Sequence, residues 1–359
     1  MLGKTRSADE ILMAKPLLNV LAGQAIHPAP IWLMRQAGRY LPEYRKTRAK
    51  AASFLEFCFT PDLAVEASLQ PIRRFALDGV ILFSDILVLP HALGRKVVFV
   101  EGKGPVLEPL RHAHELDRLT PQAVRESLAA VFETLRRLRQ ELPKDVTLIG
   151  FAGAPWTVAC YMVEGEGSRD FQAVRRLAYR EPALFARLIG LLTDSTIDYL
   201  SAQIEAGAET LQIFDSWAGS LAEAELRRWS LEPLTRIVAA LKQRHPEVPV
   251  ILFPRGAGVL YREFALASGA AALSLDSSLP LAWAAEELQQ RTTLQGNLDP
   301  LLLLEGGDAM REGAERILRM LGNGPFVFNL GHGILPDTPP EHVAELVDLV
   351  RGWKASTTA

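Results

Sequence analysis

The sequence has 359 residues, enough for one large α/β domain or for two domains of ordinary size. Hydrophobic residues make up 48% of it and charged residues 23%, which is typical of a soluble protein with a large core. The formal net charge of −3 gives no reason to expect binding to nucleic acid or to a membrane surface. Any cationic site must therefore be local.

The two cysteines, Cys58 and Cys160, lack the spacing of a zinc site or a disulfide framework, which indicates a reducing compartment. Residues 1–15 carry charges of both signs and no long apolar core, so we expect no signal peptide. Every apolar stretch is too short for a membrane span. The sequence thus favours a cytoplasmic protein.

An amphipathic helix is predicted over 7–22, with Ser7 and Glu10 as a capping box. A short apolar run, Ile31 to Met34, then opens into a loop that holds arginines 35, 39, 45 and 48. A buried strand that ends in a cationic loop is a common way to begin an anion site in an α/β enzyme.

Short apolar runs then recur along the chain, and nearly all are followed by a helical pattern. Eight strands are predicted, at 31–34, 79–85, 146–156 with its loop, 210–216, 248–255, 272–276, 293–299 and 326–331. Helices are predicted at 61–75 (limited by Pro71), 120–138, 169–206 with a break near Pro182, 220–244, 260–268, 280–290, 308–321 and from a cap at Thr338 and Pro339 to about 354. A hairpin is predicted over 95–107.

Eight parallel strands with helical crossovers predict an α/β fold of the (β/α)₈ TIM-barrel type. The surplus residues are assigned to the N-terminal helix and to a hairpin-containing insertion after the second strand. No linker interrupts the repeating part, so we expect a single domain over 1–359. The alternative, an open doubly wound sheet, lacks its usual Gly-x-Gly-x-x-Gly turn.

Polar residues follow the predicted strands at one end, which in a barrel is the end that carries active sites. They are Arg35, Asp85, Asp215, Ser216, Arg255, Asp276, Asn297, Asp299 and His332. The competing explanation is that such residues only cap the next helix or fill a loop junction.

Arg35 and Arg39 would repel each other on a helix unless an anion binds both, although Glu43, Glu56 or Asp62 could instead pair with them. Asp85 ends an apolar strand and needs hydrogen-bond donors, or its pKa will rise.

His332 lies between Gly331 and Gly333, which would leave it accessible to a ligand. The small, apolar tract 150–156 is interpreted as a flat wall for a large ligand. No pair or cluster has the spacing of a metal site.

Five segments resemble motifs of the uroporphyrinogen decarboxylase family, in order, between about residues 29 and 350. They are MRQAGRYLPEYR (34–45), FSDIL (83–87), GFAGAPWTVACY (150–161), FDSW (214–217) and NLGHG (329–333). Trp217 stands where the animal-type enzymes have a histidine, which implies a bacterial-type sequence.

The resemblance implies a (β/α)₈ barrel that forms a homodimer and needs no cofactor. The implied reaction removes the four acetate carboxyls of uroporphyrinogen III stepwise, giving coproporphyrinogen III and CO₂ in haem biosynthesis. The implied active-site residues are Arg35, Arg39, Asp85, Tyr161, Ser216 and His332, with Arg48, Phe214 and the backbone after Phe151 as further binding candidates.

In that reaction Asp85 would accept hydrogen bonds from the pyrrole N–H groups and stabilise positive charge on the ring. Arg35, Arg39 and His332 would hold carboxylates, and Tyr161 and Ser216 would position the reacting acetate. Whether Arg35 also helps to deliver the proton is left open. Two alternatives are a zinc- or corrinoid-linked methyltransferase on the same barrel, disfavoured because no cysteine lies near His332, and a tetrapyrrole carrier, which would not need Asp85.

Overall fold

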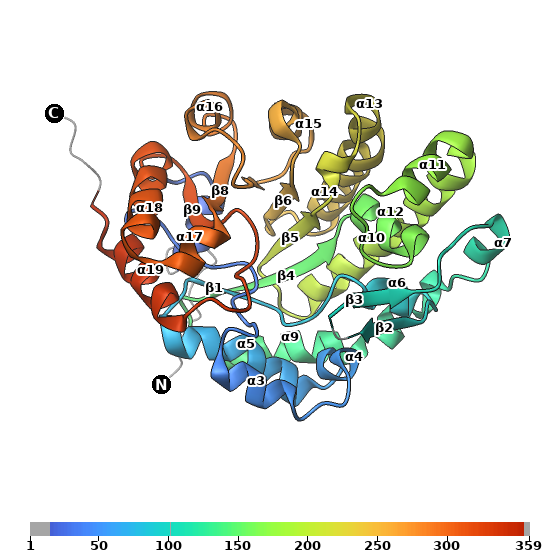
Figure 1. The fold of residues 1–359 in the computed structure, drawn as a ribbon, viewed down its shortest axis with the longest axis horizontal. Helices are drawn as coiled ribbons and strands as arrows, with labels where there is room; N and C mark the ends of the chain where they lie inside the picture. The colour runs from blue at the N-terminus through green and yellow to red at the C-terminus, as the bar shows by residue number, and fades with distance from the viewer. Residues whose placement is uncertain (1–14, 101, 355–359) are drawn as a thin grey trace, which may run out of the picture.

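The computed structural model describes residues 15–100 and 102–354 as a ring of parallel strands enclosed by helices (Figure 1). Seven strands pair in the order β1 (Gly79–Ile81), β4 (Thr147–Gly153), β5 (Thr210–Asp215), β6 (Val250–Pro254), β7 (Ala272–Ser274), β8 (Thr293–Leu298) and β9 (Phe326–Leu330). All neighbours are parallel, with β1 starting opposite Thr147 of β4. The predicted TIM-barrel class is confirmed.

The segment between β9 and β1 is less regular than predicted for 31–34. It forms a single parallel bridge, Ile31 to Phe328. The reason is that its amides bond to side chains: those of Ile31, Leu33 and Met34 donate to Asp78, Gln36 and Asn329. It nevertheless closes the ring, because the Phe328 amide donates to the Pro30 carbonyl (2.8 Å) and the Asp78 amide to the Ile31 carbonyl (2.9 Å).

Helices surround the ring and bury their apolar faces against it. The longer ones are α5 (Pro61–Phe75), α9 (Ala129–Glu141), α10 (Pro155–Glu164), α11 (Gln172–Arg180), α12 (Pro182–Glu205), α14 (Glu232–Arg244), α18 (Gly307–Leu321) and α19 (Pro340–Gly352). The shorter ones are α2 (Pro16–Leu21), α3 (Pro42–Arg48), α4 (Phe54–Cys58), α6 (Val88–Ala92), α7 (Ala113–Leu116), α8 (Val124–Ser127), α13 (Glu223–Leu226), α15 (Tyr261–Ala267), α16 (Leu281–Glu287) and α17 (Pro300–Glu305). In the described chain no helix has the length and apolarity needed to cross a membrane.

A compact apolar cluster fills the inside of the barrel. Trp32, Ile149, Ile251, Phe253 and Val327 meet there, and none of the five is exposed. Helix α2 adds Leu17, Val20 and Leu21 to the same cluster. The N-terminal helix therefore closes the end of the barrel opposite to the carboxyl ends of the strands, and the other end is left for function.

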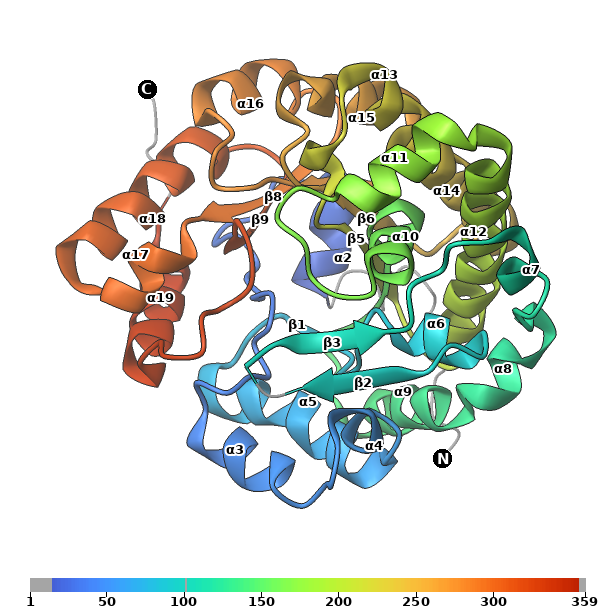
Figure 2. The ribbon, with the colours of Figure 1, turned by 45° about the vertical axis from the view of Figure 1, so that its right-hand side comes forward.

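The predicted hairpin is confirmed as β2 (Val97–Val100) paired antiparallel with β3 (Gly104–Leu107). Figure 2 shows it crossing beside the carboxyl ends of the strands. Phe99 packs on Phe54 of α4, with ring centroids 4.6 Å apart. This contact holds the insertion over one side of the barrel mouth.

Several helix predictions need correction. The Ser7–Glu10 capping box lies outside the described residues, and only the later part of the 7–22 helix is described, as α2. Helix α5 continues through Pro71 to its end. The helix predicted over 120–138 is interrupted at Leu128, between α8 and α9. Thr338 makes no capping hydrogen bond, because α19 begins one residue later than that cap requires and has Pro339 at its N-cap.

Candidate active site

Eight side chains singled out from the sequence line one cavity of about 970 Å³ at the carboxyl ends of the strands, which we name the mouth cavity. They are Arg35, Arg39, Arg48, Asp85, Tyr161, Phe214, Ser216 and His332. The volume lies at the upper end of the range of small-molecule sites, which is roughly 300–1,000 Å³. The structure thus brings together residues that are up to 297 positions apart (332 − 35).

Arg35 is held in place by both of its chain neighbours. The Met34 carbonyl accepts a hydrogen bond from the Ile334 amide (2.9 Å), and the Gln36 amide group donates to the Gly79 carbonyl (3.0 Å). Arg35 itself has a φ of 60°, a left-handed conformation that costs an arginine about 1 kcal/mol or more. Contacts to β1 and to the loop after β9 therefore hold a strained backbone at a residue that lines the cavity.

Gly333 makes room for the Arg35 side chain, and Gly333 and His332 both line the mouth cavity. A Cβ on Gly333 would overlap the Cδ and Cγ atoms of the Arg35 side chain. A Cβ on Gly331 would overlap the backbone of Ser277. Both glycines thus allow close packing within the protein.

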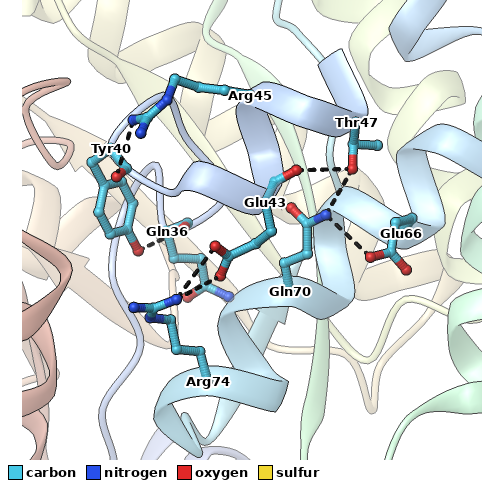
Figure 3. Close-up of polar contacts among 8 residues, drawn as sticks. All are labelled: Gln36, Tyr40, Glu43, Arg45, Thr47, Glu66, Gln70 and Arg74. Carbon is cyan, nitrogen blue, oxygen red and sulfur yellow. Dashed lines mark hydrogen bonds and ion pairs between the residues drawn. The ribbon is translucent and has the colours of Figure 1, made fainter. Parts of the chain in front are cut away.

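The arginine loop is fixed to helix α5 by polar contacts (Figure 3). The Tyr40 hydroxyl donates to the Gln36 carbonyl (2.8 Å), and Glu43 pairs with Arg74 (3.2 Å). Arg45 donates to the Arg39 carbonyl (2.6 Å), so its role here is structural.

The carboxylates that could have neutralised the loop have other partners. Glu43 pairs with Arg74, Asp62 pairs with Arg137 and Glu56 accepts from the Ala52 amide. Within 15–100 and 102–354, neither Arg35 nor Arg39 forms an ion pair. Two cations without a protein anion therefore face the cavity.

Asp85 lies deep in the mouth cavity and is only partly neutralised. One of its oxygens accepts the Leu87 amide (2.8 Å). Burial raises the pKa of Asp85 to about 6, although the Leu87 amide and the positive charge of Arg35 act in the opposite direction. The carboxyl is therefore mainly ionised at neutral pH and has room to accept further donors.

Arg35 shares this environment. Its side chain is accessible within the cavity, yet the depth of the site lowers the pKa of Arg35, and the charges of Arg39 and Arg255 lower it further. Tyr161 and Asp85 oppose this change. An anion bound here would relieve the repulsion among the arginines.

Tyr161 lies on α10, a helix that the sequence analysis missed. Eight of the ten residues of α10 are buried, so the segment has no polar face to produce a helical period. The Tyr161 ring packs on Trp217, with centroids 4.3 Å apart. Burial, with Asp85 nearby, raises the pKa of Tyr161 to about 12, so the hydroxyl is a neutral donor.

His332 is neutral at physiological pH. Its Nδ1 accepts a hydrogen bond from the Gly333 amide (2.6 Å), which leaves Nε2 to carry the proton. Burial lowers the pKa of His332 to about 3, and Arg35 and Arg255 add to this effect. His332 can therefore donate one hydrogen bond to an anion but adds no charge.

The tract 150–156 is not the flat wall that the sequence suggested. A Cβ on Gly150 would lie 2.5 Å from the Oε1 of Gln203, and one on Gly153 would lie 2.8 Å from Val158. These glycines allow helices to pack closely, and Phe151 is the member of the tract that lines the cavity.

Lys103, which was not predicted as a site residue, also lines the cavity. It lies at the hairpin tip between Gly102 and Gly104, which have φ values of 75° and 88°. Its ammonium pairs with Glu166. The signal that could have revealed it is a single cation between two glycines in the insertion nearest the barrel mouth.

Three other strand-end residues, Asp276, Asn297 and Asp299, make hydrogen bonds within the protein. Asp276 accepts the Gly256 amide (2.8 Å), Asn297 donates to the Asp276 carbonyl (2.9 Å) and Asp299 caps α17 through the Leu301 amide (3.0 Å). The described residues contain no cluster of His, Cys, Asp or Glu side chains that could hold a metal ion. The chemistry of the cavity is thus that of one carboxylate surrounded by cations and neutral donors.

Comparison with known proteins gives the family. Residues 13–353 match the model of the family described as uroporphyrinogen decarboxylase (URO-D). The chain belongs to this family. It is 57% identical over 337 residues to the uroporphyrinogen decarboxylase of Rhodospirillum rubrum, covering 94% of this chain and 97% of the relative. It is 54% identical over 340 residues to that of Sinorhizobium fredii, covering 95% and 98%.

The function predicted from the motifs is confirmed: the chain is a carboxy-lyase of haem biosynthesis in the uroporphyrinogen decarboxylase family. A solved methyltransferase from Methanosarcina mazei has the same fold, with a TM-score of 0.77 over 93% of this chain and 97% of its own. Its sequence identity is 22%, so this likeness concerns the fold alone.

Proposed function

We propose that the mouth cavity binds uroporphyrinogen III, with Asp85 against the pyrrole N–H groups and the cationic rim against the side-chain carboxylates. The observation that carries this assignment is the arrangement of charge: the buried carboxylate of Asp85 shares the cavity with Arg35 and Arg39, which have no ion-pair partner among the described residues. A macrocycle with inward N–H donors and outward carboxylates is complementary to this pattern.

The reaction needs an electron sink for the pair of electrons that the broken bond to the carboxylate carbon leaves behind. Protonation of a pyrrole carbon next to the acetate turns the ring into a cation. The bond to the carboxylate carbon then breaks, CO₂ leaves, and the electron pair forms an exocyclic double bond that neutralises the ring. Protonation of this methylene and loss of the ring proton give the methyl group, so each cycle takes up one proton net. Because the pyrrole is its own electron sink, no cofactor is required.

Asp85 stabilises the cationic intermediate. An ionised carboxylate near the ring lowers the energy of a positive charge that exists only after protonation, and such preorganised groups typically contribute 10²–10³-fold in kcat. Its pKa of about 6 in the free protein leaves it mostly ionised at neutral pH.

The other residues bind and orient. Arg35 and Arg39 grip carboxylates, with Arg48 and Lys103 extending the positive rim. His332 donates from Nε2 as a neutral group, consistent with its lowered pKa. Phe214, with Tyr161 and Ser216, lines the side where the reacting acetate is positioned, Tyr161 and Ser216 as neutral donors.

A homodimer in the cytoplasm completes the proposal. Val259 is 75% exposed and Leu266 62% exposed, in and after the loop that follows β6, and apolar side chains in such positions suit a subunit interface. Cys58 and Cys160 are buried and unpaired, as expected in a reducing compartment. Light scattering on the purified protein measures the subunit number.

The decisive experiment is incubation of the purified protein with uroporphyrinogen III under anaerobic conditions. We expect CO₂ release and the appearance of porphyrinogens with seven, six, five and four carboxyls. The Asp85→Asn variant should keep its fold and lose about 10²–10³-fold in kcat. Absence of less-carboxylated products with the wild type, or wild-type turnover in the variant, would contradict the proposal.

A further inference from the structure

Asp215 is a buried carboxyl that the proposed reaction does not use. It is the last residue of β5, it has no exposed surface and it does not line the mouth cavity. Two hydroxyls donate to it: Thr157 of α10 to Oδ1 (2.6 Å), and Ser230 of the π-helical turn η3 (Arg227–Leu231) to Oδ2 (2.5 Å). One side chain thus joins a strand to two helical elements.

The Thr157 hydroxyl continues this connection towards the cavity. Its oxygen accepts a hydrogen bond from the Trp217 amide (3.3 Å). The neighbouring Trp156 ring donates to the Trp217 carbonyl (3.0 Å), so α10 holds both the amide and the carbonyl of Trp217. The turn at Ser216 and Trp217 therefore has its position set by Thr157.

Tyr161 is reached by the same connection. Thr157 and Tyr161 are four residues apart on α10, so they lie on one face of the helix. The Trp217 ring packs on the Tyr161 ring at 4.3 Å. A shift of the Trp217 backbone would consequently move both Ser216 and the surface that supports Tyr161.

We propose that Asp215 is a positioning residue: by accepting the Thr157 proton it fixes the direction of the Thr157 hydroxyl and, through Trp217, the geometry of Ser216 and Tyr161. A hydroxyl has one hydrogen, so donation to Asp215 leaves its lone pairs for the Trp217 amide. An asparagine at 215 could donate from its NH₂ group to the Thr157 hydroxyl instead. The Thr157 hydrogen would then point towards the Trp217 amide, which is itself a donor, and that hydrogen bond would be lost.

Packing alone does not account for this carboxyl. Burial raises the pKa of Asp215 to about 6, and its side-chain partners are two neutral hydroxyls. A buried acid held in this way costs stability relative to an apolar side chain. The arrangement fixes the direction of the Thr157 hydroxyl rather than stabilising the fold.

The test uses variants on the two arms of Asp215. Thr157→Val removes the arm that leads to the cavity, and Ser230→Ala removes the arm that does not. We expect Thr157→Val and Asp215→Asn each to lower kcat by about 10–100-fold, the effect of a small misplacement of reacting groups. Ser230→Ala should stay within about 3-fold of wild type at a similar loss of thermal stability, and Thr157→Ser should restore kcat.

The inference rests on the proposed roles of Tyr161 and Ser216, which Tyr161→Phe and Ser216→Ala test separately. Full activity in both would contradict those roles. Impaired Tyr161→Phe together with normal kcat in Asp215→Asn or Thr157→Val would overturn the positioning inference alone. Equal losses of kcat in Thr157→Val and Ser230→Ala at equal stability would overturn it as well, because they would show a purely structural role.

Discussion

The position of the Arg35 side chain depends on the absence of a Cβ atom at Gly333. Its side chain occupies the space that a Cβ on Gly333 would take, and its backbone is already held at a φ of 60°. The guanidinium therefore has one well-supported position, which a substitution at a neighbouring glycine can disturb without touching any charge.

Gly333→Ala should displace Arg35 and leave the fold intact, because the atoms it meets belong to a flexible side chain. We expect kcat/KM for uroporphyrinogen to fall by about 10–100-fold. The comparison variant, Gly331→Ala, meets the backbone of Ser277 and should lower the free energy of unfolding by about 1–3 kcal/mol. Steady-state kinetics and urea unfolding separate the two. Unchanged kinetics in Gly333→Ala would contradict the account of Arg35.

Asp85 should make stability depend on pH. Because its folded pKa of about 6 lies above the unfolded value of about 3.9, its contribution is fully present below pH ~4 and is lost as the pH rises through 6. Asp85→Asn removes this loss. We expect the difference in free energy of unfolding between the variant and the wild type, measured with urea, to be up to about 3 kcal/mol more favourable to the variant at pH 8 than at pH 4. Asp337→Asn, at an exposed site, should show no such difference.

At the scale of elements, the β2–β3 hairpin adds a cation to a site otherwise built on the barrel. Phe99 anchors it to α4, and Lys103 reaches the cavity from its tip. A cation on an insertion can bind substrate without taking part in the bond-breaking step.

Lys103→Met should therefore raise KM for uroporphyrinogen by about 2–5-fold and leave kcat nearly unchanged, since one exposed ion pair is worth at most about 1 kcal/mol. The effect should shrink at high salt. Lys96→Met, at the exposed residue that directly precedes β2 and lies outside the cavity lining, is the matched control. A fall in kcat with constant KM would instead place Lys103 at the reacting atoms.

At the scale of the molecule, the ring is closed through Asp78. Its carboxyl accepts hydrogen bonds from the Ile31 amide (2.7 Å) and from Arg351 (2.9 Å). Asp78, which directly precedes β1, thus connects β1 to the segment around Ile31 and to the last helix, α19. Closure and the placement of Arg35 are thus linked, because Arg35 follows Ile31 by four residues.

Asp78→Ala should lower the free energy of unfolding by about 1–3 kcal/mol, since it leaves the buried Ile31 amide without an acceptor and removes the ion pair with Arg351, which keeps its hydrogen bond to the Ala76 carbonyl. It should also lower kcat/KM through Arg35. Arg351→Met keeps the bond to Ile31 and should cost less stability, with normal kinetics. Urea unfolding and steady-state rates measure both effects; equal losses of kcat/KM in the two variants would contradict the link.

Most strands and helices of this molecule are predictable from the sequence. The places where backbone amides bond to side chains instead of to a neighbouring strand are not. Seven strands were recovered because apolar runs between helical periods are a local signal. The segment 31–34 is less regular than the predicted strand, because the local sequence pattern does not reveal that its amides bond to the side chains of Asp78, Gln36 and Asn329. Helix α10 was missed because a helix buried on all sides has no period.

The site shows the same division. Strand-end position selected Arg35, Asp85 and His332, and the resemblance added Tyr161. Lys103 was missed because its place depends on how the insertion folds back over the barrel. The neutral state of His332 could not be read from sequence either, since it follows from burial and from two arginines brought near by the fold.

Barrel closure also sets when the site comes into existence during synthesis. Arg35 and Arg39 leave the ribosome early, but the strand that seats them, β9, and the glycine beside Arg35 are translated about 300 residues later. The site that places Arg35 beside Asp85 and His332 therefore forms only after β9 and Gly333 have been synthesised.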